Sequence, residues 1–198
     1  KIYSNAGRLE LAEKENFEID ILTNYLPESM SDEEIRSLIK KIVEEKKEGN
    51  RVLVFCHYVE EMDLLKRLLT EQGVGVEMLN GKTTTKQRRI IPKMTPDALL
   101  VQVQSCCEGL NLQQFSTVIF TSTHRNPAVE DQAIARAHRI GQEKPVKVYR
   151  YICGGLGSST VTLDQYCMSV QDAKRELMAG FIKDSVDKLR SNDNSQVV

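Results

Sequence analysis

Three side chains able to bind phosphate recur at helical spacing in the second half of the chain. Gln132, Arg136 and Arg139 stand at positions i, i+4 and i+7, so on a helix they share one face. Two arginines three residues apart repel each other unless an anion lies between or in front of them. Guanidinium groups fit phosphate oxygens, where a transferring phosphoryl group develops charge. The pattern indicates a phosphate site, and a solvated basic face is the alternative interpretation.

A helix that presents these side chains must pack against other elements, and the sequence predicts such elements. Ala133, Ala137 and Ile140 form a second, small apolar stripe that would let the helix pack closely on a sheet. Apolar runs alternate with amphipathic segments, which is typical of parallel βαβ units with right-handed crossovers. We therefore expect an α/β fold, a parallel sheet flanked by helices, with strands at 51–56, 76–79, 98–104, 117–122 and 146–152 and helices at 31–48, 59–72, 85–94 and 128–140.

The chain divides into four expected segments. Residues 1–30 form an N-terminal extension that leads into the α/β domain of residues 31–153. Residues 154–190 contain a Gly- and Ser-rich linker and a long amphipathic helix that could dock across the core. Residues 191–198 are polar and are expected to form a disordered tail.

Composition excludes several classes of protein. The 198 residues are 40% hydrophobic and 28% charged, which excludes disorder throughout, and no apolar run is long enough for a transmembrane span. A net charge of −1 argues against a general polyanion binder. Five cysteines without a CxxC spacing favour a reduced, intracellular compartment. The chain begins with Lys1 and shows no signal peptide, so we expect it to be a piece of a longer protein.

Polar loops follow several predicted strands. In a parallel α/β sheet the loops beyond the carboxyl ends of the strands form the ligand crevice, so His57, residues 80–84 and residues 105–111 should line one rim, which the arginine pair should also face. A basic run beside these loops is either a solvated helix face or a track for nucleic-acid phosphates. It consists of Lys82, Lys86, Arg88, Arg89 and Lys93.

Other patterns give weaker evidence for a functional site. Gly81-Lys82-Thr83 resembles the end of a phosphate-binding P-loop, but the required glycine is replaced by Val76, so the chain has no self-sufficient site for ATP hydrolysis. The three histidines favour packing or surface positions over metal binding. Small residues that fill a turn are favoured for Cys106-Cys107 over a thiol nucleophile.

The string DQAIARAHRIGQ, followed by VKVYRYI, resembles the last motif of Swi/Snf-type helicase-like ATPases, the DNA-translocating remodellers of helicase superfamily two. Further segments agree in order: RVLVFCHYVEEMDLLKRLL, LNGKTTTKQR, EGLNL, STVIF and RNP. The resemblance covers about residues 34 to 183 and implies the second RecA-like lobe alone. The last helix looks like the family's brace helix.

The resemblance also implies roles for particular residues. Arg136 and Arg139 would be arginine fingers that reach across an interlobe cleft to the γ-phosphate of ATP, with Gln132, Gly109 and Glu108 as further nucleotide-binding residues. Nucleic-acid contacts would come from His57, Lys82, Thr83, Ser105 and Asn111.

Partners and cofactors follow from the same resemblance. The cofactor would be ATP, with magnesium held mainly by a first lobe that this chain lacks. The partners would be that N-terminal helicase lobe of the same polypeptide and double-stranded DNA, without a membrane. The location would be intracellular, and nuclear in a eukaryote. The parent would be a DNA-dependent ATP hydrolase, while the isolated fragment would hydrolyse none.

Some positions depart from the family pattern. Cys106 and Cys107 stand where the family has small residues, and Ser122, His124 and Arg125 replace its acidic and tryptophan residues before the Asn-Pro pair. A catalytically inactive docking module is therefore an alternative, and an RNA helicase lobe is another.

Overall fold

Helices and strands alternate along nearly the whole described chain. The structure is a computed structural model that describes residues 32–104, 110–152 and 163–193. Its elements, in chain order, are α3 (Asp32–Lys47), β1 (Val52–Cys56), α4 (Val59–Glu71), β2 (Val76–Leu79), α5 (Thr85–Ile90), the 3-10 helix η1 (Ile91–Met94), β3 (Ala98–Gln102), β4 (Thr117–Phe120), α6 (Pro127–Ala137), β5 (Lys147–Arg150) and α7 (Leu163–Asp193).

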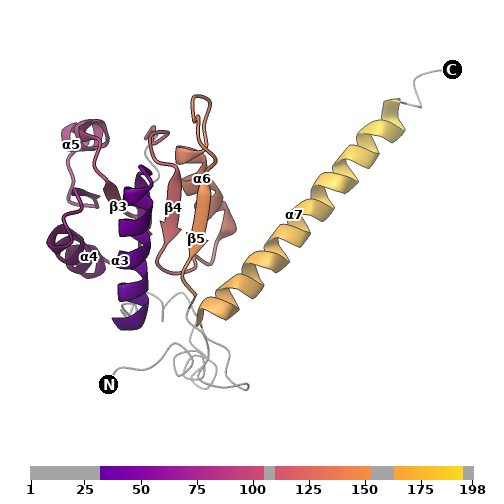
Figure 1. Cartoon of the computed structure of the whole chain (residues 1–198). Coiled ribbons are helices and arrows are strands. Elements are labelled where there is room, and N and C mark those ends of the chain that lie inside the picture. The colour runs from indigo at the N-terminus through magenta and orange to yellow at the C-terminus, as the bar shows by residue number, and fades with distance from the viewer. Residues whose placement is uncertain (1–31, 105–109, 153–162, 194–198) are drawn as a thin grey trace.

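The five strands form one sheet in the order β2-β3-β1-β4-β5, and every pairing in it is parallel. β1, β3 and β4 occupy the middle, and their apolar runs are buried because helices cover both faces. β5 is an edge strand with a polar sequence, KVYR, and is only partly covered. The predicted α/β fold with a parallel sheet flanked by helices is confirmed (Figure 1).

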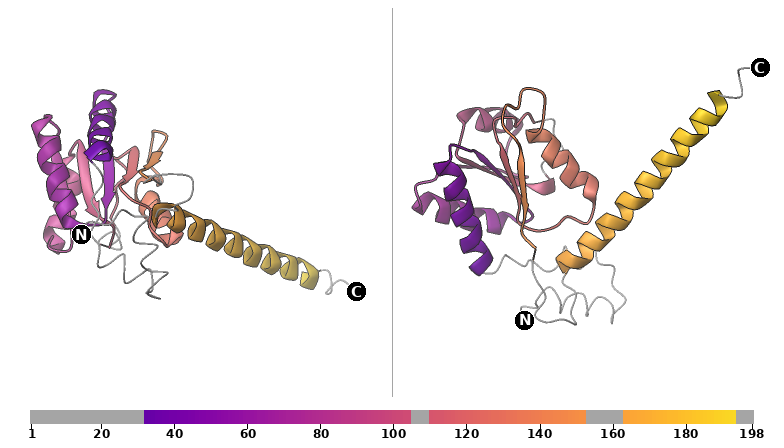
Figure 2. Two further views of the ribbon diagram at one scale, coloured as in Figure 1. Left: turned by 90° about the horizontal axis from the view of Figure 1, so that it is seen from below. Right: turned by 45° about the vertical axis from the view of Figure 1, so that its right-hand side comes forward.

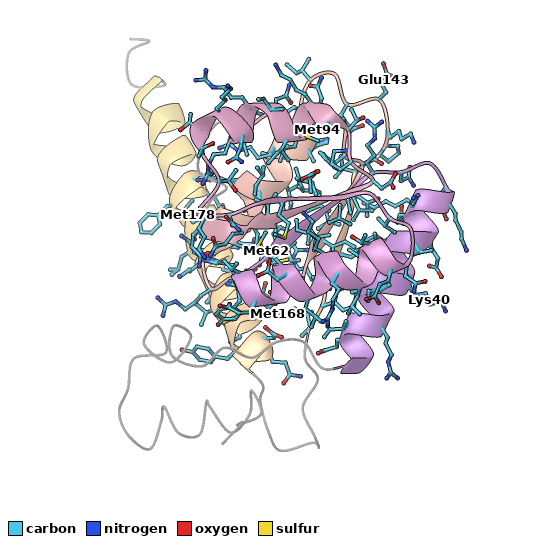
Figure 3. The ribbon with its side chains drawn as sticks, turned by 90° about the vertical axis from the view of Figure 1, so that its left-hand side faces the viewer. Lys40, Met62, Met94, Glu143, Met168 and Met178 are labelled. Atoms are coloured by element: carbon cyan, nitrogen blue, oxygen red, sulfur yellow. The ribbon has the colours of Figure 1, made fainter. Side chains whose placement is uncertain are left out.

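Two apolar clusters fill the space between the sheet and its helices. On one face, Met62 and Leu65 of α4 and Leu38 of α3 pack against Val54 of β1. Figure 3 shows Met62 between the ribbon of α4 and the strands of the sheet. On the other face, Phe55 and Phe120 stack with ring centroids 5.2 Å apart, beside residues of α6 and of the segment before β4. The alternation of side chains along each strand assigns neighbouring residues to opposite clusters.

Several boundaries differ from the predictions, each for a local reason. The helix expected at 85–94 splits into α5 and η1, because Pro92 cannot donate the backbone hydrogen bond of a continuous helix. Thr84 and Gln87 close a capping box at the start of α5. The helix expected at 128–140 ends at Ala137, and the expected packing of Ile140 is wrong, since that side chain is fully exposed.

A buried carboxylate fastens the edge strand at the start of β5. Glu45 of α3 is 0% exposed and lies 3.2 Å from Lys147 Nζ, the first residue of β5. Its carboxylate also accepts hydrogen bonds from Asn50 Nδ2 at 2.8 Å and from Thr117 Oγ1 at 2.9 Å. Burial alone would raise the pKa of Glu45, but the hydrogen bonds from Asn50, Thr117, Lys41 and Lys147 lower it to about 2.

The last helix leaves the sheet domain instead of lying across it. In α7 the first turns carry the buried residues Asp164, Cys167 and Gln171, whereas the side chains from 172 to 183 are exposed. Figures 1 and 2 show the helix running outward from the domain, and Figure 3 shows Met178 on this outer part. The expected docking across the core is therefore limited to the first turns.

α7 continues to Asp193, which is three residues beyond residue 190, the expected end of the linker and helix segment. The linker residues 153–162 lie outside the described part of the chain. Among the described residues, the helices lack the combination of length and apolar character that crossing a membrane requires.

Candidate functional site

The helix that carries the phosphate-binding candidates begins at the carboxyl end of β4. Asn126 caps it by accepting a hydrogen bond from the amide of Ala128 at 3.1 Å, and Pro127 occupies the first turn. α6 then returns along the sheet, with Ala133 and Ala137 completely buried against it. The small alanine side chains bring α6 close to the sheet, as predicted.

The two arginines lie at the far end of this helix. Arg136 is half-buried in the last turn, and its Nε is buried without a hydrogen-bond partner among the described residues. Arg139 lies two residues beyond the helix and is exposed, with its Nε donating to the carbonyl oxygen of Ala135 at 3.1 Å. Neither forms an ion pair with a carboxylate of the described chain. Both guanidinium groups therefore retain donors for an external anion.

Hydrogen bonds of one glutamine fix the conformation of the loop that carries Arg139. Gln142 Nε2 donates to the carbonyl oxygens of Gln113 at 2.8 Å and Phe115 at 3.0 Å. Gly141 has a φ of +98°, and a Cβ atom there would lie 3.3 Å from the side chain of Gln113. The positive φ therefore favours glycine, and a Cβ atom would also make a tight contact with the Gln113 side chain. The Gly-Gln pair at the end of the motif fixes the loop that carries Arg139.

The arginines do not face the rim predicted for them. α6 runs antiparallel to the strands, so its last turn lies where the strands begin. The amide of Leu112, which precedes β4, donates to the carbonyl oxygen of Arg136 at 3.0 Å, and Gln142 contacts the same segment. The prediction of one shared rim is wrong, because an 11-residue helix carries the pair across to the amino edge of the sheet.

His57 lies at the opposite, carboxyl edge, directly after β1. Its ring stacks on that of His124, which follows β4, with centroids 5.7 Å apart and an interplanar angle of 14°. Burial, and then the nearby His124, lower the pKa of His57 to about 4, so the ring is neutral at physiological pH. His57 Nε2 is buried without a hydrogen-bond partner among the described residues. The ring thus packs against His124, in line with the packing interpretation of the histidines, and its contact with nucleic acid stays a prediction.

The basic run after β2 lies on this carboxyl side, but its members have different tasks. Lys82 is exposed in the turn before α5. Thr83 Oγ1 accepts a hydrogen bond from the amide of Asn80 at 3.0 Å, which holds that turn together. Arg88 is 8% exposed and donates to the carbonyl oxygens of Thr83 and Asn80, so it supports the loop and is removed from the predicted phosphate track. Lys86 and Arg89 remain exposed.

The remaining predicted site residues are distributed differently. Asn111 Nδ2 donates to Gln113 Oε1 at 3.3 Å, so it lies at the amino edge beside the arginine end, apart from Lys82 and Thr83. Gln132 is exposed in the middle of α6. The predictions for Ser105, Glu108 and Gly109 lie outside the described residues. The structure thus divides the predicted site between two edges of one sheet.

Sequence reasoning missed a buried carboxylate at the start of α6. Glu130 is 0% exposed and pairs with Arg150 Nε at 2.8 Å. A signal was available, because Glu130 stands three residues before Ala133 and seven before Ala137, on the face of the helix that packs on the sheet. Gln142 gave no such signal, since its partners are backbone carbonyls of distant residues.

These features define a class of protein: a RecA-like α/β lobe with an arginine pair at one edge and a polar, partly basic set of loops at the other. A family model described as the helicase conserved C-terminal domain matches residues 32–141, more than half of the chain. The chain belongs to this helicase C-terminal domain family, and its predicted Swi/Snf-type character is confirmed. A model of Yqey-like proteins matches residues 1–52, most of which lie outside the described part.

Individual relatives support this placement. Protein CHROMATIN REMODELING 19 of Arabidopsis thaliana is 34% identical over 148 residues, which is 72% of this chain and 18% of the relative. DNA repair protein RAD5A of the same plant is 28% identical over 173 residues, 85% of this chain and 16% of the relative. The chain spans between 6% and 18% of the curated relatives that it matches here.

A solved structure agrees with the fold. The C-terminal part of the Fun30 ATPase domain superimposes with a TM-score of 0.59 at 21% identity, covering 87% of this chain and 63% of that one. At this identity the likeness concerns the fold alone. The family match shows a helicase C-terminal lobe of the kind found in ATP-dependent helicases and remodellers.

Proposed function

We propose that the chain is the second lobe of an ATP-dependent DNA translocase of the chromatin-remodelling type. In this proposal Arg136 and Arg139 act as arginine fingers on an ATP molecule bound by a first lobe of the same polypeptide. The observation that carries it is the arginine pair at the end of α6, whose guanidinium groups form no ion pair within the described chain. Arginines left with free donors at the edge of a domain are suited to phosphate oxygens.

The chemistry assigned to this lobe is electrostatic. When ATP binds between the lobes, the two guanidinium groups would donate to γ-phosphate oxygens and stabilise the charge that develops during transfer. Gln132, on the same helix, would help to place the nucleotide. As the family resemblance implies, the proposal assigns magnesium mainly to the first lobe.

The nucleic-acid contacts are assigned to the other edge of the sheet. Lys82, Lys86 and Arg89 are exposed in the turn after β2 and along α5, and would follow the phosphate backbone of one DNA strand. Because ATP and DNA are assigned to separate edges of the sheet, the proposal requires that hydrolysis moves the whole lobe as one rigid body. Closing and reopening of the two lobes would then shift the DNA by a small step in each cycle.

The direct test replaces the arginines in the parent polypeptide that contains both lobes. Arg136→Ala or Arg139→Ala should lower DNA-stimulated kcat for ATP by about a thousandfold, because arginine fingers contribute three to five orders of magnitude. Arg67→Ala is the matched control, since Arg67 is an exposed arginine on α4, on the opposite face of the sheet. Turnover within about twofold of the unmodified protein for either finger variant would contradict the role.

A non-catalytic docking module is the second candidate. It is favoured by Ser122, His124 and Arg125, which replace the acidic and tryptophan residues of the family pattern. An unmodified parent without ATP turnover, with or without DNA, would establish this second function. Stimulation by RNA in place of DNA would instead indicate an RNA helicase.

A further inference from the structure

The carboxylate of Glu130 accepts hydrogen bonds from three parts of the molecule. Oε1 accepts hydrogen bonds from the amide of His124 at 2.9 Å and from Gln171 Nε2 at 2.8 Å. Oε2 accepts from Arg150 Nε at 2.8 Å. The residue is 0% exposed, and a buried carboxylate is stable only when such partners surround it. Glu130 therefore joins the β4–α6 loop, strand β5 and helix α7 at one point.

Several polar contacts attach α7 to the domain. Gln171 Nε2 also donates to the carbonyl oxygen of His124, and Asp164 Oδ1 accepts from the amide of Thr123 at 3.3 Å. One turn beyond Gln171, Arg175 lies 3.2 Å from Asp131. Hydrogen bonds have strict geometry, unlike apolar burial, so contacts of this kind set the direction of a helix.

The same carboxylate belongs to the helix that carries the arginines. Glu130 lies in the first turn of α6 and Arg136 in the last, and Ala133 between them and Ala137 directly after Arg136 are completely buried. An 11-residue helix packed this closely moves as one body. A change in the direction of α7 would therefore bear on α6 through Gln171 and Glu130.

We propose that Glu130 is a positioning residue that links the direction of α7 to the placement of the arginine pair. Through Gln171 it fixes the start of α7, and through α6 it fixes Arg136 and the loop to Arg139. The inference rests on the proposed function for its effect on ATP turnover. The claim that Glu130 fixes the direction of α7 does not depend on ATP turnover.

The first test removes only the amide donor. Gln171→Leu leaves the ion pair of Glu130 with Arg150 in place, and Asp172→Leu is the matched control, because it adds the same side chain at the next, exposed position of α7. Spin labels are introduced as unnatural amino acids at Lys40 of α3 and Met178 of α7, both exposed, so that native cysteines remain. Pulsed electron paramagnetic resonance then measures the distance between the labels in the parent polypeptide.

We expect one narrow distance distribution in the unmodified protein and in Asp172→Leu, and a broadened one in Gln171→Leu. In the same samples Gln171→Leu should lower kcat about tenfold and change KM for ATP less than about twofold, since the arginines act on the reaction more than on nucleotide binding. An unchanged distance distribution overturns the inference. A broadened distribution with kcat unchanged overturns it as well.

A second variant tests whether the effect comes from misfolding and not from the lost contact. Glu130→Gln keeps an oxygen for Gln171 but loses the ion pair with Arg150, and it should broaden the distribution less than Gln171→Leu does. Combined with Gln171→Leu it should add little further loss of kcat, because both changes act on the one hydrogen-bond network around Glu130. Fully additive losses would show independent roles and overturn the inference.

Arg136→Ala, measured in parallel, separates the two proposals. If Arg136→Ala leaves turnover unchanged, the arginine-finger function fails, whatever happens to α7. If Arg136→Ala abolishes turnover but Gln171→Leu does not lower it, only the positioning role of Glu130 fails.

Discussion

Glu45 and Glu130 are both completely buried, and each fastens one end of the edge strand β5. Glu45 pairs with Lys147 at the start of the strand, whereas Glu130 pairs with Arg150 at its end. The partners of Glu45 all belong to α3, the sheet and the turn between them. Glu130 adds a partner from α7, which leaves the domain. A buried, hydrogen-bonded carboxylate thus fastens β5 to the domain at the start of the strand, and a second one at its end also sets the direction of α7.

The largest effect is expected at Glu45. Its pKa is lowered from 4.5 to about 2 in the folded state, so its contribution is complete above pH 4.5 and is lost as pH falls toward 2. The free energy of unfolding should drop by about 3 kcal/mol across that interval, and Glu45→Gln should flatten this part of the curve. Denaturant unfolding of the isolated lobe at several pH values measures it.

Glu48→Gln is the control for Glu45, because Glu48 also contacts Lys147 but is exposed. It should leave the slope between pH 4.5 and 2 nearly intact. Parallel curves for Glu45→Gln and the unmodified lobe would show that Glu45 does not hold this edge.

A smaller effect is expected at His57, on the other edge. Burial, with the nearby His124 in second place, lowers its pKa from 6.5 to about 4, so the folded state favours the neutral ring. Stability is complete above pH 6.5 and is lost as pH falls from 6.5 to 4. Between pH 7 and pH 5 the free energy of unfolding should fall by about 2 kcal/mol.

His57→Gln should remove this loss, whereas His138→Gln, which changes an exposed histidine, should keep it. The two edges would then respond in different pH intervals, the carboxyl edge between 6.5 and 4 and the amino edge below 4.5. A loss between pH 7 and 5 that persists in His57→Gln would remove this distinction.

The smallest effect is expected at the exposed end of the α7 attachment. Arg175 and Asp131 are 43% and 60% exposed, so solvent screens their attraction. Arg175→Ala should change the free energy of unfolding by about 0.5 kcal/mol or less. A thermal melt of the lobe at low and at 1 M salt checks this. A larger loss would mean that the attachment does not depend mainly on Glu130.

The order of the elements followed from the sequence because buried strands and amphipathic helices leave periodic patterns. The apolar run of β1 is a local signal, and this strand formed within the expected range, whereas the helix expected at 85–94 ended at Ile90. The inward turn of Arg88 and the tethering by Gln142 could not be predicted, since each depends on carbonyl groups brought close only by the fold.

The position of the arginines shows the same limit. Their shared spacing with Gln132 was visible, but the edge they occupy depends on where α6 ends. A three-residue difference in that boundary left Arg139 in a loop and Ile140 in solvent. The direction of a crossover helix, more than the identity of its residues, decided where the candidate chemistry lies.

The strand order also bears on how the chain assembles during synthesis. β1 is made first, yet its two neighbours in the sheet, β3 and β4, follow after 41 or more intervening residues. The central strand must wait for partners that are still to be translated, and closing such long loops is slow. Until Gln102 has been synthesised, the apolar run VLVFC has neither of its partner strands, so a nascent chain that pauses earlier would depend on a chaperone to stay free of aggregation.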